Sequence, residues 1–295
     1  MIKRVVEISN GPVNLSLRTG QMIISKDGEE VGQAPIEDLG TLVIDHRLVT
    51  YTNALVCALL ENNVSVVVCG ENHHPVGLFL PMEANTVHAE VITLQAEAGP
   101  RLKNRLWKDI IIAKIKNQAY ALQSVNLKGD VLLELADGVT SGDPDNVEGR
   151  AAHIYWQRLF GENFRRDRFG ESPNNFLNYG YAVLRASVAR AICSAGLHPS
   201  LGIHHRNKYN AFALADDLME PMRPMVDVMA FGLRQEGKTE LSKEEKAKLL
   251  GLPSMAIERQ GQSLSLLVFL HGYTASLKRV FSGEGKAIEF PRLIL

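Results

Sequence analysis

Residues 101–125 read RLKNRLWKDIIIAKIKNQAYALQSV, and residues 174–196 read NNFLNYGYAVLRASVARAICSAG. In both stretches apolar residues recur every three or four positions, which is the spacing of one face of an α-helix. The two stretches therefore predict long helices within a mostly helical region. Its expected helix boundaries are two starts, DPDN at 143–146 and SPNN at 172–175, and one end, at Gly196 before Pro199.

The sequence before residue 80 has a different periodicity. Short segments rich in β-branched residues, at 4–9, 13–18, 21–25 and 41–45, are separated by turns that include the pairs Asn10-Gly11, Thr19-Gly20 and Asp27-Gly28. Asn-Gly and Asp-Gly favour the positive φ of tight hairpin turns, so these segments are predicted to form a β meander. A helix over residues 50–63 and a further strand over residues 64–70 are expected to follow it.

The change of periodicity predicts an α+β fold with two domains. Pro75 and Gly77 interrupt the strand pattern shortly before residue 80. We therefore expect a small β-rich amino-terminal domain over residues 1–80, followed by a larger, mostly α-helical domain over residues 81–295.

The composition is that of an ordinary globular chain. Of the 295 residues, 45% are hydrophobic and 22% are charged, and no apolar run is long enough to span a bilayer. Residues 1–10 lack the apolar segment of a secretory signal, so we expect a cytoplasmic protein without a membrane partner. The three cysteines form no CxxC pair, which suggests neither a disulfide framework nor a thiolate zinc site.

The charge is unevenly distributed along the chain. Residues 1–100 hold 5 Lys and Arg against 12 Asp and Glu, whereas residues 150–208 hold 9 against 3. A polyanion would be attracted to this basic middle segment. A solvated basic face explains the same count, so the charge alone does not decide between the two.

One segment concentrates possible metal ligands. Asp217 and Glu220 are three residues apart, so on a helix their carboxylates would share a face and repel each other unless a cation lay between them. His205 precedes Asp217 by twelve residues, across a polar segment that would let the imidazole fold back over the helix. A mixed set of oxygen and nitrogen ligands suits Mg²⁺ or Mn²⁺ better than a closed structural zinc site.

The same residues have a plain structural explanation, which the sequence leaves open. Asp217 would cap a helix with Glu220 at N3, and Asp145 would cap another with Glu148 at N3, without any metal. The histidines that would equally be surface or packed side chains are His73, His74, His204 and His205.

Three blocks of the sequence together resemble the CRISPR adaptation integrase family. They are NVEGRAAHIYW at 146–156, SPNNFLNYGYAVLRASVARAI at 172–192 and LGIHHRNKYNAFALADDLMEPMRP at 201–224. They follow a β-rich part in the family's order, so the resemblance covers essentially the whole chain. The compact length and the sequence LADDLMEP resemble those family members that accompany a single-protein effector nuclease. Such a nuclease is therefore a candidate partner.

The resemblance implies a divalent metal site with Mg²⁺ or Mn²⁺ as the cofactor. The family's metal-binding glutamate falls on Glu148, its histidine on His205, and its second carboxylate on Glu220, where some relatives carry aspartate. Asp217 fills the neighbouring acidic position and is expected among the catalytic residues, binding a second cation or orienting the first. His205 is chosen because it precedes Asp217 by the family's usual twelve residues. His204 is expected to support the ligands without binding the metal itself.

The reaction implied by the resemblance is a transesterification on DNA. The 3′-hydroxyl at an end of a short duplex attacks a phosphodiester at the border of a repeat in a CRISPR array. With water in place of the hydroxyl, the same site would cut nucleic acid. The residues expected to bind the DNA backbone are Arg165, Arg166, Arg168 and Asn175, with Tyr179 and Tyr181 either stacking on bases or packed in the core.

Insertion of a duplex requires one joining event on each strand, so an oligomer is expected. The resemblance implies a homodimer built through the β-rich domain and two such dimers bridged by a small ferredoxin-like partner protein of adaptation. Two other functions remain open from the residues. One is a DNA-architectural dimer without catalysis, and the other is a zinc-dependent hydrolase of small substrates that uses His204 and His205 together.

Overall fold

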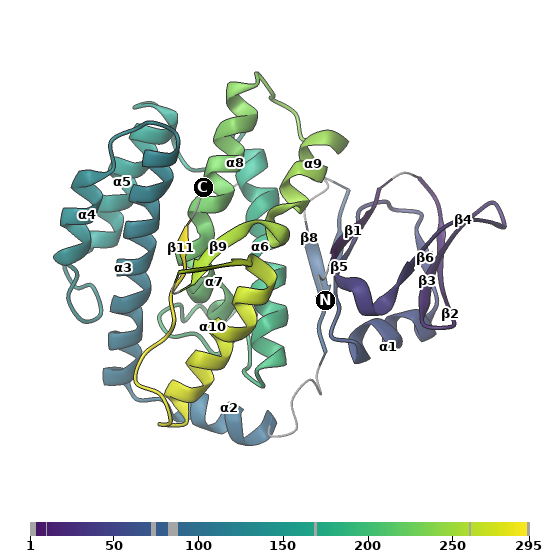
Figure 1. Ribbon diagram of the computed structural model, residues 1–295, viewed down its shortest axis with the longest axis horizontal. Coiled ribbons are helices and arrows are strands. Elements are labelled where there is room, and N and C mark those ends of the chain that lie inside the picture. Colours follow the sequence, from purple (N-terminus) through teal and green to yellow (C-terminus); the bar gives the residue numbers. More distant parts are fainter. Residues whose placement is uncertain are drawn as a thin grey trace.

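The computed structural model describes residues 4–9, 11–71, 75–81, 88–167, 170–259 and 261–293. A smaller β-rich part and a larger helical part lie side by side (Figure 1), so the predicted α+β class is confirmed. The predicted boundary near residue 80 falls between the last strand of the β-rich part and the first helix of the helical part. Asn10, His73, His74 and Arg168, which entered the sequence predictions, lie outside the described residues.

Two of the predicted hairpins form one sheet of the β-rich part. It contains β2 (Asn14–Arg18), β3 (Gln21–Lys26), β4 (Glu29–Pro35) and β6 (Thr50–Tyr51), in the order β4-β3-β2-β6. Thr19-Gly20 and Asp27-Gly28 all have positive φ, as two-residue hairpin turns require. The predicted meander is therefore confirmed for the segments at 13–18 and 21–25, whereas its last predicted segment, 41–45, belongs to a different sheet.

The first strand does not continue this meander. β1 (Arg4–Ile8) pairs in parallel with β5 (Leu39–Ile44) in a second sheet, which β7 (Ser65–Cys69) and β8 (Pro75–Phe79) complete in the order β1-β5-β7-β8. The predicted pairing of residues 4–9 with the next segment is thus wrong. The reason is that a parallel pair needs a long crossover, and the meander itself forms that crossover.

The second sheet is apolar on both faces because it separates two cores. All six residues of β5 are buried. Leu42, Ile44 and Val66 pack inside the β-rich part, whereas Val43 and Val67 pack against the helices. Alternation of side chains along the strands therefore joins the two parts through one shared layer. α1 (Asn53–Glu61), the helix predicted over residues 50–63, lies in the β-rich part.

The helical part is arranged around α6, in which sixteen of 21 residues are buried. Both long helices predicted from the sequence are present, as α3 and α6. The helices of this part are α2 (His88–Glu97), α3 (Pro100–Ser124), α4 (Asp130–Asp137), α5 (Val147–Phe160), α6 (Asn174–Ser194), α7 (Ala213–Met219), α8 (Arg223–Gln235), α9 (Lys243–Leu250) and α10 (Leu266–Phe281). A small sheet of β10 (Gln262–Ser265), β9 (Ala256–Arg259) and β11 (Arg292–Leu293) packs against α10 and α3.

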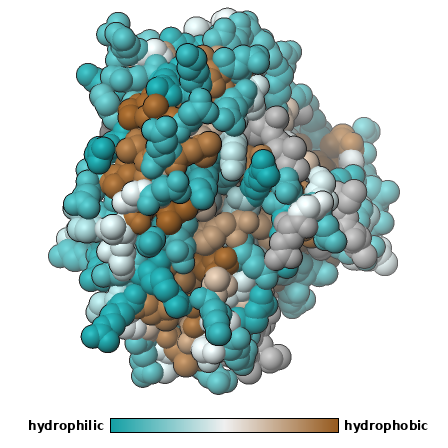
Figure 2. Space-filling model, turned by 60° about the vertical axis from the view of Figure 1, so that its left-hand side comes forward, coloured by the Kyte–Doolittle hydropathy of each residue, from teal (hydrophilic) through white to brown (hydrophobic). Residues whose placement is uncertain are grey.

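Hydrophilic side chains cover most of the face shown in Figure 2, with smaller apolar patches between them. Within the described ranges, no helix combines the length and the apolar character needed to cross a bilayer.

A buried ion pair joins the two parts. Lys246 on α9 places its Nζ 2.5 Å from Oδ2 of Asp45, which directly follows β5. Both side chains are almost completely buried, so neither charge is compensated by water. We expect the pair to fix α9 against the second sheet, because separating the two charges would leave each of them in a low-dielectric interior.

Replacing Lys246 with Met should therefore lower the free energy of unfolding by about 3 kcal/mol, because the Asp45 carboxylate loses its counter-charge. Urea unfolding followed by circular dichroism measures this change. Lys248→Met is the matched control on the same helix, since Lys248 and its partner Glu236 are each about half exposed. The control should cost less than about 1 kcal/mol. Equal costs for the two variants would contradict the assigned role of the buried pair.

A buried carboxylate ties three helices together. Asp227 on α8 accepts hydrogen bonds from the hydroxyls of Tyr155 on α5 and Tyr181 on α6. Burial raises the pKa of Asp227 to about 7, although both hydroxyls and Arg223 oppose this shift. The folded state therefore keeps a proton that the unfolded chain has already lost, between the unfolded pKa and about pH 7.

Protonation of Asp227 in the folded state stabilises the fold at low pH. This stabilisation should be lost as the pH rises through the folded-state pKa of Asp227. We expect thermal stability between pH 5 and pH 8 to fall more steeply for the wild type than for Asp227→Asn, which keeps hydrogen-bonding atoms but does not titrate. The difference should be on the order of 2 kcal/mol, at about 1.4 kcal/mol per pKa unit. Parallel pH profiles of the two proteins, measured by calorimetry, would rule out this account.

Candidate functional site

The loop before α7 is wrapped around a single carboxylate. Asp217 is completely buried and accepts backbone N–H bonds from Ile203 at 2.6 Å, His204 at 3.0 Å and His205 at 3.2 Å. Its Oδ1 also lies 2.5 Å from Nδ1 of His205. Asp217 lies inside α7, so the alternative in which it caps a helix is excluded. Its oxygens are instead occupied in shaping the loop and orienting one imidazole.

The contact with Asp217 defines the state of the His205 ring. The hydrogen bond to Asp217 raises the pKa of His205, burial opposes this, and the nearby Asp217 and Glu220 charges raise it further. Because the carboxylate can only accept, Nδ1 carries the proton in this bond. In the neutral ring Nε2 is then the nitrogen with a lone pair, which is the arrangement of a metal-binding histidine supported by a carboxylate.

His204 holds the same loop against α3. Its ring stacks on Trp107, with centroids 4.1 Å apart and an interplanar angle of 5°. The rings of His204 and His205 are nearly perpendicular, at 87°. The His204 ring is therefore held by packing, and its assisting role stays a prediction. The perpendicular rings give no basis for a site in which both imidazoles bind one ion.

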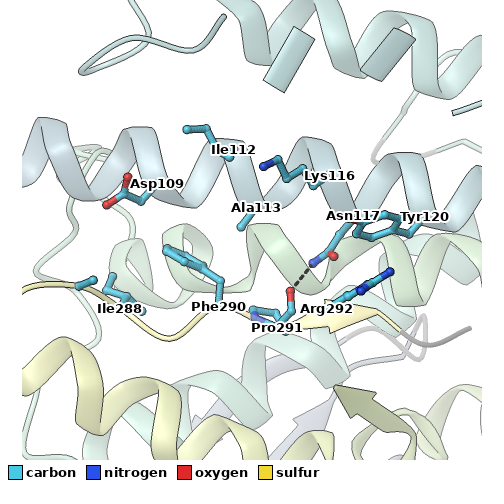
Figure 3. A pocket seen from close by; sticks show the side chains of 11 residues that line it. Asp109, Ile112, Ala113, Lys116, Asn117, Tyr120, Ile288, Phe290, Pro291 and Arg292 are labelled. Carbon is cyan, nitrogen blue, oxygen red and sulfur yellow. Dashed lines mark hydrogen bonds between the residues drawn. The ribbon is translucent and has the colours of Figure 1, made fainter. Parts of the chain in front are cut away.

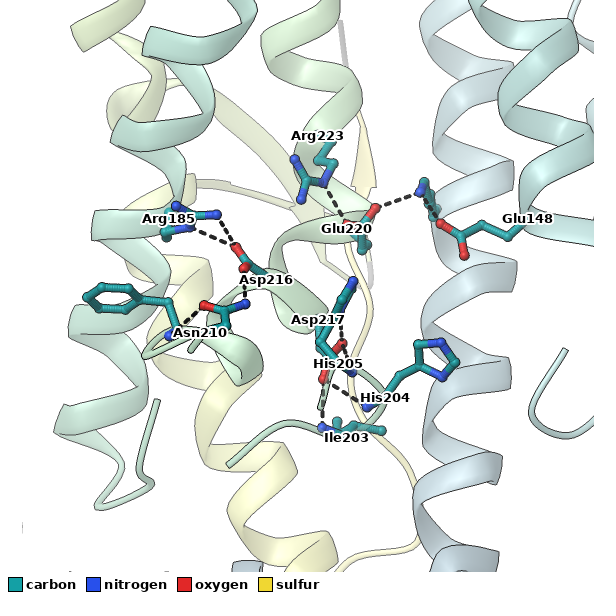
Figure 4. Close-up of polar contacts among 12 residues, drawn as sticks. Glu148, Arg185, Ile203, His204, His205, Asn210, Asp216, Asp217, Glu220 and Arg223 are labelled. Carbon is teal, nitrogen blue, oxygen red and sulfur yellow. Dashed lines mark hydrogen bonds and ion pairs between the residues drawn. The ribbon is translucent and has the colours of Figure 1, made fainter. Parts of the chain in front are cut away.

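Glu148 and Glu220 come together around Lys114, which is not among the predicted site residues. Nζ of Lys114, on α3, lies 2.5 Å from Oε1 of Glu148 and 2.6 Å from Oε2 of Glu220. The other Glu220 oxygen accepts a bond from Nε of Arg223 at 2.7 Å. Burial alone would raise the pKa of Glu220, but Arg223 and Lys114 outweigh it and lower the pKa to about 2. Figure 4 shows the two carboxylates turned toward each other from different helices.

Helix capping does not explain Glu148. The amino terminus of α5 is capped by Asn146, which accepts from Gly149 N, and by Asp143, whose oxygens accept from the N–H groups of Val147 and Glu148. The expected Asp145 cap is thus wrong, because Asp143 and Asn146 satisfy these donors first. The Glu148 side chain is left to pair with Lys114.

The four residues predicted for the site form two contacting pairs, Glu148 with Glu220 through Lys114 and His205 with Asp217. The Glu220 charge also acts on His205. They come from α5, the loop after α6, and α7 with the 3₁₀ turn that follows it (Glu220–Met222). In the part of the chain that the structure describes, no three His, Cys, Asp or Glu side chains form a group that could hold a metal ion. The Lys114 ammonium lies between the two glutamates instead. Apart from this ion pair, the buried Oε2 of Glu220 has no hydrogen-bond partner. An oxygen whose partner is a cation, beside a second carboxylate that binds the same cation, suits a hard divalent cation.

The residues predicted to bind DNA differ in exposure. Arg165 and Arg166 are exposed before α6, whereas Tyr179 and Tyr181 are buried, as in the packed alternative. Asn175 is tied to the backbone oxygen of Thr239.

The basic segment is connected to the carboxylate pair through one ring. The guanidinium carbons of Arg166 and Arg223 lie 5.3 Å and 4.7 Å from the centre of the Tyr181 ring. Arg223 in turn binds Glu220. Tyr181 therefore links the exposed Arg166 to the site through cation–π contacts.

A separate hollow lies between α3 and the segment before β11 (Figure 3). Asn117 closes its floor by donating to the carbonyl of Pro291. Lys116, Tyr120 and Phe290 are among its lining residues, and it contains none of the predicted site residues. This hollow is therefore distinct from the carboxylate site, although both use α3.

Comparison with known proteins gives one consistent family. Residues 8–251 match the model of the family described as CRISPR associated protein Cas1. A relative from Neisseria meningitidis serogroup C (strain 8013), a CRISPR-associated endonuclease Cas1, is 35% identical over 100% of this chain and 97% of its own length.

Solved structures share the fold at lower identity. A casposase bound to integration product matches with a TM-score of 0.80 and 20% identity, over 97% of this chain and 93% of the casposase chain. A chain of a Cas6-RT-Cas1–Cas2 complex matches with a TM-score of 0.76 and 18% identity, over 99% of this chain and 36% of its own length. Both likenesses concern the fold.

One glycine in the histidine loop has no space for a side chain. A Cβ at Gly202 would lie 2.4 Å from the His205 carbonyl oxygen and 3.1 Å from Oδ2 of Asp217. No sequence pattern singles out Gly202, because the contact arises only when the loop closes on Asp217.

Gly202→Ala should therefore displace the loop and lower the free energy of unfolding by roughly 1–3 kcal/mol. In a Trp156→Phe background, Trp107 fluorescence should change because the His204 stack is disturbed. Gly232→Ala on α8 is the control, since no heavy atom lies within 4 Å of its added Cβ. A Gly202 variant as stable as this control, with unchanged emission, would disprove the tight closure.

Proposed function

We propose that this chain, which belongs to the CRISPR associated protein Cas1 family, is a metal-dependent DNA integrase and endonuclease that inserts short DNA fragments into a CRISPR array. The observation that carries the proposal is the pairing of Glu148 and Glu220, from different segments, around one positive charge, with the Glu220 charge also acting on His205. The casposase likeness supports the choice of integration, because that protein was solved with an integration product.

Glu148, His205 and Glu220 would hold Mg²⁺ or Mn²⁺ through carboxylate oxygens and the imidazole Nε2. When bound, the cation supplies positive charge that polarises the attacked phosphate and stabilises the developing negative charge. Asp217 acts through His205, since its own oxygens are occupied by N–H groups. We therefore assign Asp217 as a positioning residue and Glu220 as a ligand whose other oxygen is fixed by Arg223.

The proposed reaction conserves the number of phosphodiester bonds. The 3′-hydroxyl oxygen of the fragment forms a bond to phosphorus, while the bond from phosphorus to the 3′-oxygen of the array strand breaks. The attacking hydroxyl loses a proton and the leaving oxygen gains one, so no external energy source is required. With water as the attacking group, the same steps give strand cleavage.

DNA would be held mainly through its phosphates. Arg165 and Arg166 are exposed, and we include Arg168 with them on the strength of the basic sequence segment. Because Tyr179 and Tyr181 are buried and Asn175 binds Thr239, we propose that these three position the segment without stacking on bases. Binding through phosphates predicts a strong dependence on salt concentration.

The proposed assembly is a homodimer that works with a small partner protein. Two strands must be joined, and one site reaches one of them at a time. The match to a chain of a Cas1–Cas2 complex supports the presence of a Cas partner. The ferredoxin-like character of that partner, and any contact with an effector nuclease, remain parts of the proposal.

Glu220→Gln should lower the rate of strand joining by about 100-fold or more, because it removes a charged ligand from the site. Joining is measured with a labelled short duplex, a plasmid carrying a CRISPR array, the small partner protein, and either Mn²⁺ or a chelator. Wild-type joining should require the divalent cation.

Duplex binding by Glu220→Gln, followed by fluorescence anisotropy, should stay within about threefold of wild type, since the arginines are unchanged. Glu236→Gln is the matched control, because Glu236 is half exposed on the surface, and it should join normally. Normal joining by the Glu220 variant would reject the ligand assignment. Loss of duplex binding together with joining would indicate a structural role for Glu220.

A further inference from the structure

We propose that Lys114 is a resident cation that occupies the divalent metal position between Glu148 and Glu220 and is displaced when the metal binds. This inference rests on the function proposed above and extends it to the metal-free protein. Lys114 was not among the predicted site residues, although it interrupts the apolar face of α3 within the run IIIAKI.

The geometry supports exchange between the two cations. One nitrogen lies within 2.6 Å of an oxygen from each glutamate. Oxygens that hold an ammonium at this distance need to move by only about half an ångström to hold Mg²⁺ at about 2.1 Å. The oxygens that the metal would use are thus the same ones that Lys114 now binds.

The two cations cannot share this position. A metal bound by both oxygens would lie within about 4 Å of an ammonium that stayed in place, where like charges repel strongly in a partly buried site. Arg223 is not the group that leaves, because it binds the other Glu220 oxygen and its guanidinium lies over the Tyr181 ring. Lys114 carries its charge on a flexible four-carbon stem, so it is the cation that would turn aside when the metal binds.

The exchange gives Lys114 two effects that can be measured separately. In the metal-free protein it neutralises two carboxylates, one of them almost fully buried, that would otherwise repel each other across α3. During metal binding it competes for the same oxygens and so weakens the apparent affinity. A residue that merely supported the metal-bound site would strengthen that affinity.

Lys114→Met separates the two effects, because it keeps the length of the side chain and removes the charge. We expect the metal-free variant to melt roughly 5 °C or more below wild type. We expect its Kd for Mn²⁺, measured by electron paramagnetic resonance, to be about tenfold lower than that of wild type. Lys116→Met is the matched control, since Lys116 lines the separate hollow on α3, and it should change neither quantity.

The outcomes distinguish this inference from the proposed function. If wild type and Lys114→Met bind Mn²⁺ with equal Kd, or the variant binds more weakly, the displacement is overturned while the metal site stands. If neither protein binds Mn²⁺, the metal site itself fails and the inference fails with it.

Wild-type protein provides a second measurement if the variant does not fold. Lys114 is buried without metal, so it should react slowly with an acylating reagent. Saturating Mn²⁺ should increase its labelling several-fold relative to Lys116, as quantified by peptide mass spectrometry. Labelling of Lys114 that stays at the metal-free level while Mn²⁺ is bound would contradict the displacement.

Discussion

The site depends on one electrostatic constraint: two carboxylates from distant segments must stay close together in a partly buried place. Glu148 and Glu220 are brought there by α5 and by the turn after α7, and the Lys114 ammonium lies within 2.6 Å of both. Without a cation, their repulsion would favour separation of the helices that carry them. The charge of Lys114 therefore has a structural role on α3, and the same charge balance makes the position suitable for a metal ion.

The histidine loop meets a related constraint in a different way. Asp217 is completely buried, yet four N–H groups from the loop and the His205 ring satisfy its oxygens. The carboxylate thus accepts the backbone hydrogen bonds that a helix or strand would otherwise provide for this loop. The stack of His204 on Trp107 attaches the loop to α3 as well. Both halves of the site therefore contact α3, the loop through Trp107 and the glutamates through Lys114. The position of His205 relative to the glutamates thus depends on how α3 is packed.

Much of this organisation was predictable from sequence, because it follows from local periodicity. The long helices α3 and α6 and the two hairpins from β2 to β4 were predicted from the spacing of apolar residues and from turn pairs. The partner of β1 was not, since pairing with β5 depends on which strand is buried on both faces, a property of the assembled fold. Spacing and crowded charge pointed to His205, Asp217 and Glu220, whereas Glu148 and the metal-binding roles came from resemblance. The contacts that join them, through Lys114, Arg223 and Gly202, arise only in three dimensions.

Lys114 also shows what kind of sequence feature precedes such contacts. A lysine within the apolar stripe of a helix is costly to bury unless a carboxylate compensates it, and in IIIAKI the stripe is otherwise aliphatic. The reasoning that finds Asp217 and Glu220 suspicious, because like charges are crowded, applies equally to a cation placed where solvent should not reach. A crowded pair of carboxylates needs a cation, and a buried lysine needs a carboxylate. The two features together therefore predict that they meet in one site, and α3 carries the lysine of that site.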